Sequence, residues 1–488
     1  MKVDRLVHSR VEIPLHETFR TAIRETDSIS SIRVEIHAAG RVGVGYATAT
    51  PAITGDTVES IESHLDQVVA PYLISRDIAA NEVEGIGSIQ VGGMDSVQVG
   101  SVDTGQAEGE VAGRVKGRIA GRVEGKTSGK FSGRIDARPY VLGAQSNAVF
   151  GIPDRDYEDW TRQCSSGTAG VDLALHDLVF GASRSLGSEH PNLVTSVTIG
   201  AGSIGDMVAT AHRRVAAGFR VIKAKLGADP EHDAQRLIAL AKALGAIRNS
   251  EANTRLEEPG FLGQSERSGH LEHLEDSVTG TSPENQHGAF RSGDKITTGR
   301  RLVVEPDHPY QRHPGKLGSV QLWIDANQGW TVAQALEIFD SALDANVALG
   351  LFEQPTPAAD LHGLREVRLG VQERCLARGL KPVPVVADES ARTLADVDRI
   401  IAAGAADAIN VKFMKFGGLT GSGIAVAKAR AAGLGVLVGS MMEHPHSVAA
   451  AVRFASLLGG VHDLDAGWWA QDTWPLTYVD GYVSIAAS

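Results

Sequence analysis

Aromatic residues, cysteines and long apolar runs are scarce in this sequence. Only 5% of the 488 residues are aromatic, so the core must be built from Ala, Val, Leu and Ile. The 2 cysteines, Cys164 and Cys375, lie far apart without metal-ligand spacing, which excludes a disulfide framework and favours a reducing compartment. No run of ~18 apolar residues occurs, and the N-terminus MKVDRLVHSRVEIPL carries charges where a signal peptide would be apolar. We therefore expect a cytoplasmic protein with no membrane partner.

An excess of positive charge is also absent. The 59 acidic residues outnumber the 47 Lys and Arg residues, which gives a net charge of −12. This balance argues against a general affinity for nucleic acid or for an anionic membrane. With 42% hydrophobic residues, a chain of this length can bury the cores of two domains, or of a barrel with a capping domain.

A glycine-rich stretch from 84 to 147 interrupts the globular pattern. Glycine recurs every four residues within it, as in GRVKGRIAGRVEGK, and this period matches no solenoid repeat. Glycine at such density favours a flexible surface insertion, because ordering it costs much entropy. The alternative is a basic arm for an acidic partner, built from Arg114, Lys116, Arg118 and Arg122.

A second polar stretch runs from about 247 to 318. It contains five histidines, but no set of ligands in it has zinc-site spacing. We interpret it as a loop insertion rather than a metal site. Insertions of this length are either functional lids or disordered, and the sequence leaves both open.

Outside these stretches, short β-rich runs alternate with helical patterns. The eight runs are 194–199, 220–225, 321–325, 349–353, 384–388, 407–412, 435–440 and 461–465. Eight parallel strands with crossover helices predict a (β/α)8 TIM-like barrel. Residues before them alternate like antiparallel strands and are followed by a helix, which predicts an α+β N-terminal capping domain. We therefore expect a capping domain at 1–83, the first insertion at 84–147, the barrel at 148–470 with the second insertion, and a segment at 471–488 that returns to the capping domain.

Most of the predicted strands end in an acidic residue or a lysine, which can bind a metal ion or transfer a proton. Active sites of barrels of this kind lie at the carboxyl ends of the strands. Three consecutive strands end in Asp325, Glu353 and Asp388. Neighbouring strands are roughly 5 Å apart, so these carboxylates can converge on one hard cation, for which Mg²⁺ is the usual choice. The alternative is a structural ring of salt bridges with the nearby lysines.

Lysines end two other strands on the same rim. Lys223 and Lys225 alternate along one strand and point the same way, into the barrel mouth. Lys412 ends a strand four positions round and approaches from the opposite side. A proton donor–acceptor on each face of a substrate carbon is what racemisation or epimerisation requires. A metal bound to the substrate carboxylate would stabilise the enediolate that forms. Lys412 and Lys415 could otherwise simply end their strand.

These motifs resemble a known family. The segments KAKLG, WIDANQGW, FEQP, ADES and INVKFMKFGG are similar to those of the muconate-lactonizing subgroup of the enolase superfamily. The resemblance implies Mg²⁺ ligands at Asp325, Glu353 and Asp388. It implies an acid/base pair of Lys225 and Lys412, with Lys223 as an electrostatic helper and Lys415 in support.

Two further motifs resemble the L-Ala-D/L-Glu epimerases of this subgroup. Asp463 and Asp465 look like the Asp-x-Asp pair that holds a substrate α-ammonium group, and two carboxylates at i, i+2 can share one side of a strand. The segments FRTAIRETDS and PAITGD resemble the mobile loop of the capping domain, where Arg24 would meet a distal carboxylate. The segment GSMMEH implies a wall of the substrate site at Ser440, Met441 and Met442.

The sequence departs from this pattern in a few places. Gly467 stands where a proline is expected, Trp468 and Trp469 are bulky there, and the HPH sequence 444–446 has no counterpart. The expected function is a Mg²⁺-dependent dipeptide epimerase that acts on acidic dipeptides from peptidoglycan and forms a homo-oligomer. A muconate-type cycloisomerase, an o-succinylbenzoate synthase or an N-acylamino-acid racemase is the alternative among enzymes, and an inactive homologue that binds a partner is the alternative outside them.

Overall fold

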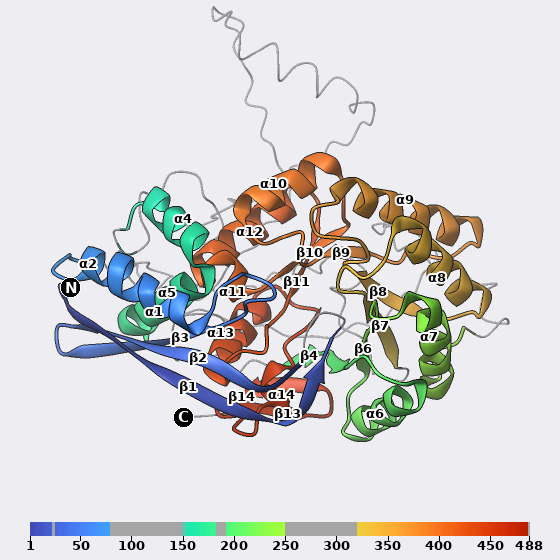
Figure 1. Ribbon diagram of the computed structural model, residues 1–488, viewed down its shortest axis with the longest axis horizontal. Coiled ribbons are helices and arrows are strands. Elements are labelled where there is room, and N and C mark those ends of the chain that lie inside the picture. The colour runs from blue at the N-terminus through green and yellow to red at the C-terminus, as the bar shows by residue number, and fades with distance from the viewer. Residues whose placement is uncertain (22–24, 79–149, 151, 182–191, 249–319, 487–488) are drawn as a thin grey trace, which may run out of the picture. The chain divides into compact units, whose positions relative to one another are not determined.

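We describe the protein from a computed structural model (Figure 1). The structure describes residues 1–21, 25–78, 150, 152–181, 192–248 and 320–486. The chain divides into two compact units, Met1–Ile247 with Glu305–Ser488 and Arg248–Val304, and the second lies outside the described residues except for Arg248. The fold below is that of the first unit. None of the helices in these described ranges is long and apolar enough to cross a bilayer.

An antiparallel sheet and a short helical run form the capping domain. The sheet order is β1 (Val3–Arg20), β2 (Glu25–Ala38), β3 (Arg41–Thr48). The helical run consists of α1 (Val58–His64), a π-helical turn η1 (Leu65–Val69) and α2 (Ala70–Leu73). From Ile32 to Ala38 of β2, every second residue is buried, as expected for a strand with one face on a core. The helical run begins at Thr57, where a capping box with Ser60 satisfies the first backbone N–H groups.

The apolar core of the capping domain continues into α4 (Asp154–Gln163) and α5 (Ser165–Phe180). Gly43 and Gly45 of β3 permit this packing, because a Cβ atom at either would lie 2.1 Å from a backbone oxygen of α5. This core therefore draws on helices beyond residue 148, where the sequence placed the start of the barrel. The limits 1–83 and 84–147, and the four basic residues of the glycine-rich stretch, remain predictions, because 79–149 lie outside the described residues.

The predicted parallel strands are all present in the described part of the chain. They are β4 (Asn192–Thr195) with β5 (Val197–Ile199), β6 (Val221–Lys225), β7 (Gln321–Asp325), β8 (Leu349–Glu353), β9 (Val385–Ala387), β10 (Ala408–Val411), β11 (Gly435–Val438) and β12 (Val461–His462). From β5 to β11, each strand pairs with the next in parallel. The barrel closes because β12 pairs with β4 and a bridge between Gly439 and Asp463 joins β11 to β12. The (β/α)8 fold expected from the sequence is confirmed.

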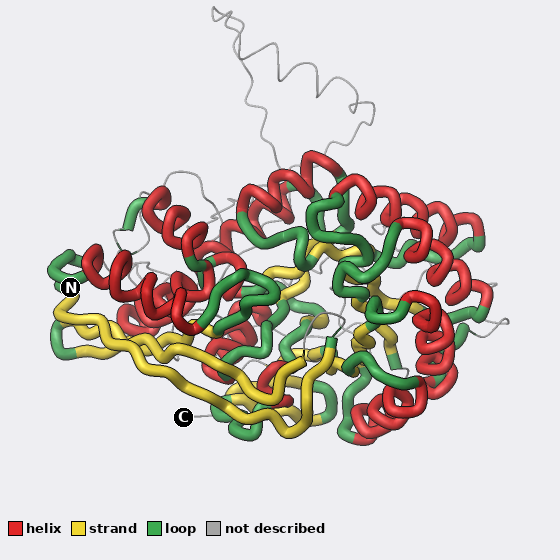
Figure 2. The backbone as a smooth tube through the Cα atoms, in the orientation of Figure 1, coloured by secondary structure: helices red, strands yellow, loops and turns green. Residues whose placement is uncertain are grey.

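Helices follow the strands and lie outside them (Figure 2). They are α6 (Ile204–Ala216), α7 (Pro230–Leu244), α8 (Val332–Asp344), α9 (Leu361–Ala377), α10 (Leu394–Ala403), α11 (Phe413–Phe416), α12 (Leu419–Ala431), α13 (Pro445–Ser456) and α14 (Ala466–Trp469). Thr331 and Thr393 begin α8 and α10 with capping boxes, and Gly245 and Gly404 end α7 and α10 in the left-handed conformation.

The barrel interior is layered. One buried apolar side chain from each strand forms a closed cluster: Val194, Val221, Trp323, Leu351, Val386, Ala408, Leu437 and Val461. Side chains two positions further along a strand point to the same side. In six strands these positions carry the polar side chains of Lys223, Asp325, Glu353, Asp388, Asn410 and Asp463. The strands therefore place a polar layer directly above an apolar one, towards their carboxyl ends.

The C-terminal segment touches the capping domain and then joins the barrel. Gln471 donates a backbone hydrogen bond to Pro14 of β1. The chain then forms the hairpin of β13 (Leu476–Val479) and β14 (Tyr482–Ile485), and β14 pairs antiparallel with β4. The return to the capping domain expected for 471–488 is thus a contact at its start.

Two buried histidines make the stability of the fold depend on pH. Burial lowers the pKa of His64, in α1, to about 4. Burial and the neighbouring His446 lower the pKa of His444, which stacks on Tyr46 of β3 at 3.5 Å, to about 3. An unfolded histidine has a pKa near 6.5, so between pH 6.5 and 4 the unfolded chain binds protons that the fold excludes. The free energy of unfolding should therefore decrease as the pH is lowered from 6.5 to 4, by on the order of 3 kcal/mol for each histidine.

Urea denaturation between pH 7 and 4 measures this dependence. His64→Gln should reduce this dependence by about half, because His444 still contributes, whereas His362→Gln, at a side chain that is 78% exposed, should leave it unchanged. A wild-type slope in the His64→Gln protein would contradict the assignment.

Candidate active site

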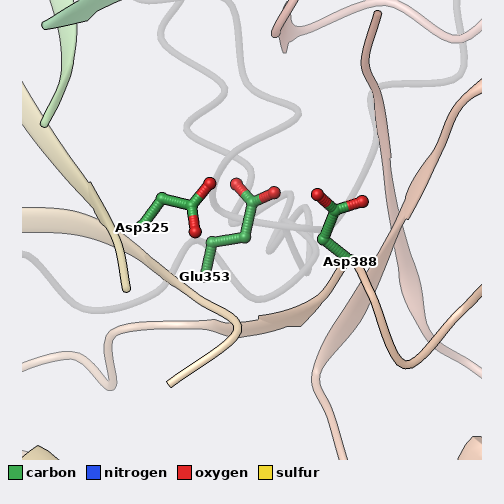
Figure 3. Close-up of side chains that lie close together, drawn as sticks. All are labelled: Asp325, Glu353 and Asp388. Carbon is green, nitrogen blue, oxygen red and sulfur yellow. The ribbon is translucent and has the colours of Figure 1, made fainter. Parts of the chain in front are cut away.

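Three carboxylates converge at the carboxyl ends of β7, β8 and β9. Asp325 and Glu353 are the last residues of their strands and are register partners, and Asp388 follows β9 directly. All three side chains are buried, and one oxygen of each lies within 4.8 Å of the others. Figure 3 shows the three groups pointing towards one another. The sequence prediction that these acids meet is thus realised in the fold, and an all-oxygen set at this spacing could hold a divalent cation.

The lysines of the rim form ion pairs with these acids. Lys223 Nζ lies 2.7 Å from Glu353 Oε2, 2.7 Å from Asp463 Oδ2 and 3.2 Å from Asp325 Oδ2. Lys225 Nζ lies 2.6 Å from Asp325 Oδ2, and Lys412 Nζ lies 2.7 Å from Asp388 Oδ2. The acids and lysines therefore form one buried network. Its three converging carboxylates are those expected for a metal site, and its lysine–carboxylate pairs are those expected for a structural ring of salt bridges.

Burial and these pairs shift the pKa values in opposite directions. Burial alone would raise the pKa of Asp388, but Lys412 and Lys415 hold it well below its ordinary value. For Glu353, burial prevails over Lys223 and raises the pKa to about 7. The Asp388 carboxylate holds the pKa of Lys412 above its ordinary value, although burial alone would lower it. Of Asp388, Glu353 and Lys412, Glu353 is thus the group that loses its charge most readily near neutral pH.

Lys225 and Lys412 reach one cavity from opposite sides of the barrel. Strands β7, β8 and β9 separate the strands that carry them. The cavity is lined by Phe19, Thr21, Ile53, Thr198, Lys225, Asn327, Asp388, Lys412, Ser440, Met441, Met442, Asp463 and Asp465. Lys415 is absent from this lining; it is buried and donates to Asp388 and to the backbone oxygen of Asn410. Of the two lysines after β10, Lys412 is the one placed to meet a ligand.

The two aspartates near β12 have different partners. Asp463 accepts a hydrogen bond from Ser196 Oγ at 2.7 Å and pairs with Lys223. Asp465 Oδ2 accepts hydrogen bonds from the Thr198 backbone N at 2.7 Å and from Trp469 Nε1 at 3.0 Å. Burial, and then the charge of Asp463, raise the pKa of Asp465. Both line the cavity as expected, but Asp463 already shares an ion pair with Lys223.

The remaining predicted residues divide into two groups. Ser440, Met441 and Met442, which follow β11, line the cavity. Arg24 lies outside the described residues. A second cavity of about 320 Å³ shares Thr21 and Lys225 with the first. The side chain of a bound molecule could therefore extend from Lys225 towards β1.

Several cavity residues are absent from the sequence predictions. Phe19, Thr21 and Ile53 belong to the FRTAIRETDS and PAITGD segments, so the signal was present, although only Arg24 was singled out. Asn327, which also lines the cavity, donates from Nδ2 to the buried Glu389 at 3.1 Å, and burial with the adjacent Asp388 raises the pKa of Glu389 to about 8. The DANQGW and ADES motifs contain these two residues, but no local pattern predicts that they pair.

The position of the Lys412 side chain depends on the absence of a side chain at Gly439. A Cβ atom on Gly439 would lie 2.9 Å from Lys412 Cε and 2.4 Å from Asn410 Oδ1. Gly439→Ala should therefore displace both residues, lower turnover by about 10- to 100-fold and cost ~1–3 kcal/mol of stability. Steady-state rates and thermal melting check this. Gly205→Ala in α6 is the control, because its Cβ has no neighbour closer than 4.0 Å, and equal rates for the two variants would contradict the prediction.

Comparison with known proteins agrees with this architecture. The enolase C-terminal domain-like family model matches residues 315–487. The L-Ala-D/L-Glu epimerase of Bacillus subtilis (strain 168) is 24% identical over 458 residues, 93% of this chain and 85% of that protein. A solved substrate-liganded complex of the L-Ala-D/L-Glu epimerase from Bacillus subtilis superposes with a TM-score of 0.62 at 23% identity, over 99% of this chain and 96% of that one.

Two further solved structures share the fold. The dipeptide epimerase of Enterococcus faecalis V583, complexed with Mg and L-Leu-L-Tyr, has a TM-score of 0.60 at 19% identity and covers 100% of this chain and 98% of that one. The muconate lactonizing enzyme of Pseudomonas fluorescens, complexed with muconolactone, has a TM-score of 0.59 at 17% identity and covers 100% and 95%. Since both are matched about equally well, the fold alone does not separate their reactions.

Proposed function

Because this chain belongs to the enolase superfamily, we propose that it is a Mg²⁺-dependent dipeptide epimerase. The reaction would be a 1,1-proton transfer at the α-carbon next to a carboxylate. One observation carries the proposal: Lys225 and Lys412 reach a single cavity from opposite sides, beside the Asp325–Glu353–Asp388 triad. Two opposed proton carriers can remove a proton from one face of a carbon and return one to the other.

The triad would hold the metal ion. Three buried carboxylates, each with one oxygen within 4.8 Å of the others, suit a hard cation. A dipeptide epimerase of the same fold was solved with Mg, which supports the choice of ion. When bound, the ion would neutralise negative charge that gathers on the substrate carboxylate as the α-proton leaves.

The three lysines would have two different roles, proton transfer and electrostatic stabilisation. One lysine of the pair, once deprotonated, would take the α-proton from its own side, and the protonated partner would deliver one to the opposite face. Lys412 would first have to leave its ion pair with Asp388, which holds its pKa above the ordinary value. Lys223 is fully buried and is held between Glu353 and Asp463, so it would act as a fixed positive charge near the reacting carboxylate.

Asp465 and Asp463 support a dipeptide substrate. A carboxylate at the edge of the cavity can bind an α-ammonium group through charge-assisted hydrogen bonds. Since Asp463 is already paired with Lys223, we assign the larger part of this role to Asp465. N-Acylated amino acids and muconate lack the ammonium group, so these residues favour the dipeptide reaction over the alternatives. Arg24 remains our proposal for the distal carboxylate of a glutamate side chain, with Ser440, Met441 and Met442 as the opposite wall.

Deuterium exchange tests the proposed function directly. The protein with Mg²⁺ and L-Ala-L-Glu in D2O should place deuterium at the glutamate Cα and form L-Ala-D-Glu, both visible by proton NMR. N-Acetylglutamate should exchange far more slowly. An absence of exchange with every acidic dipeptide would refute the proposed substrate class, and faster exchange with the N-acyl compound would favour a racemase.

A further inference from the structure

The Trp469 indole is bonded to the carboxylate of Asp465. Its Nε1 atom donates to Asp465 Oδ2 at 3.0 Å, and both side chains are buried. The backbone N of Thr198 donates to the same oxygen at 2.7 Å. The indole is therefore a side-chain donor that restricts the rotation of the carboxylate in the cavity wall.

The same indole ring contacts the capping domain. Phe19 of β1 meets it edge to face, with 5.1 Å between the ring centres and 85° between the planes. The Arg214 guanidinium of α6 lies 4.9 Å from the ring centre and forms an ion pair with Glu17 of β1. Because Phe19 also lines the cavity, one indole connects the strand that covers the cavity with a carboxylate inside it.

We propose that Trp469 is a positioning residue that couples the seating of β1 over the cavity to the orientation of Asp465, and thereby favours substrates with a free α-ammonium group. This inference rests on the proposed function. Asp463 is already paired with Lys223, so the strength of the ammonium contact depends mainly on the orientation of the Asp465 carboxylate. An indole fixed by β1 and α6 keeps that carboxylate in place before the substrate arrives, which lowers the cost of binding.

Kinetics of Trp469→Phe tests the hydrogen bond. Phenylalanine keeps an aromatic ring against Phe19 and Arg214 but lacks the N–H donor. The KM for L-Ala-L-Glu should rise about tenfold, because a hydrogen bond to a charged acceptor is lost, while kcat changes by about twofold or less. The preference for L-Ala-L-Glu over N-acetyl-L-Ala-L-Glu should fall by a similar factor.

Trp468→Phe is the matched control. This neighbouring indole packs on Phe219 and Tyr478, so the substitution should change neither KM nor the preference. A Trp469→Phe protein with wild-type KM and wild-type preference would overturn the assignment.

Hydrogen exchange tests the coupling to β1 without any turnover. Trp469→Leu, which removes the ring but retains an apolar side chain, should accelerate amide exchange in residues 15–20 by about tenfold. Trp469→Phe should not. If the wild-type protein epimerises no dipeptide, the proposed function fails, yet this measurement still decides whether Trp469 holds β1. Unchanged exchange in Trp469→Leu would refute the coupling.

Discussion

Lys225→Ala and Lys412→Ala are each expected to lower epimerisation by about 10³-fold or more, because each removes the proton carrier on one face of the substrate carbon. The two variants should fail in complementary ways. In D2O, each should exchange the α-proton of only the stereoisomer whose proton faces the remaining lysine. Proton NMR of L-Ala-L-Glu and L-Ala-D-Glu, incubated separately with each variant, measures this.

The complementary pattern separates a chemical role from a structural one. A variant that had merely lost its fold would exchange neither stereoisomer and would melt at a lower temperature. Lys428→Ala is the control, because its side chain is 36% exposed and pairs with Asp398 on the surface. If both active-site variants epimerise at the wild-type rate, the two-base mechanism is wrong.

Glu353→Gln should abolish Mg²⁺ binding and with it at least about 10³-fold of the turnover. Glutamine keeps the shape of the side chain, and its carbonyl oxygen can still accept the hydrogen bond from Asn410 Nδ2, which lies 2.9 Å from Glu353 Oε1. The loss of charge should be tolerated by the fold better here than at Asp388. Burial raises the pKa of Glu353 to about 7, whereas Asp388 balances two buried lysines.

Calorimetric titration with Mg²⁺ and thermal melting with and without EDTA check this prediction. Wild-type protein should bind one ion, lose activity in EDTA and melt at a higher temperature with Mg²⁺, since the ion binds only the folded site. Glu353→Gln should lose all three responses, while Glu373→Gln, on the exposed surface of α9, should keep them. Full activity of both variants in EDTA would support the alternative of a purely structural salt-bridge ring.

The sequence predicts the rim of the barrel well because strand geometry is periodic. Side chains alternate along a strand, so the two residues Lys223 and Lys225 had to share a side. Acids at the ends of consecutive parallel strands, such as Asp325 and Glu353, had to be neighbours. The choice between Lys412 and Lys415 came only from the family resemblance. The structure supplies a physical reason, since the Lys415 ammonium group donates hydrogen bonds to Asp388 and to a backbone oxygen.

Contacts between distant segments could not be predicted in this way. Trp469 was visible only as a bulky departure from a pattern, and its bond to Asp465 and its packing on Phe19 depend on how β1 crosses the barrel. The ion pair between Asp463 and Lys223 joins residues 240 positions apart. No local periodicity predicts this ion pair, so the sequence alone predicts the same role for Asp463 and Asp465.

The eight-residue apolar layer beneath the polar one has a consequence for how this chain tolerates change. It divides the barrel into a half that performs chemistry and a half that only supports it. The connection between α7 and β7, where the chain carries its second long polar stretch, enters β7 at the supporting end. Because the pairing of β7 with β8 holds Asp325 and Glu353 in register, we expect a longer connection to leave that register unaltered. A tag or a sensor inserted into that connection should therefore leave the arrangement of these two carboxylates, and with it turnover, unchanged.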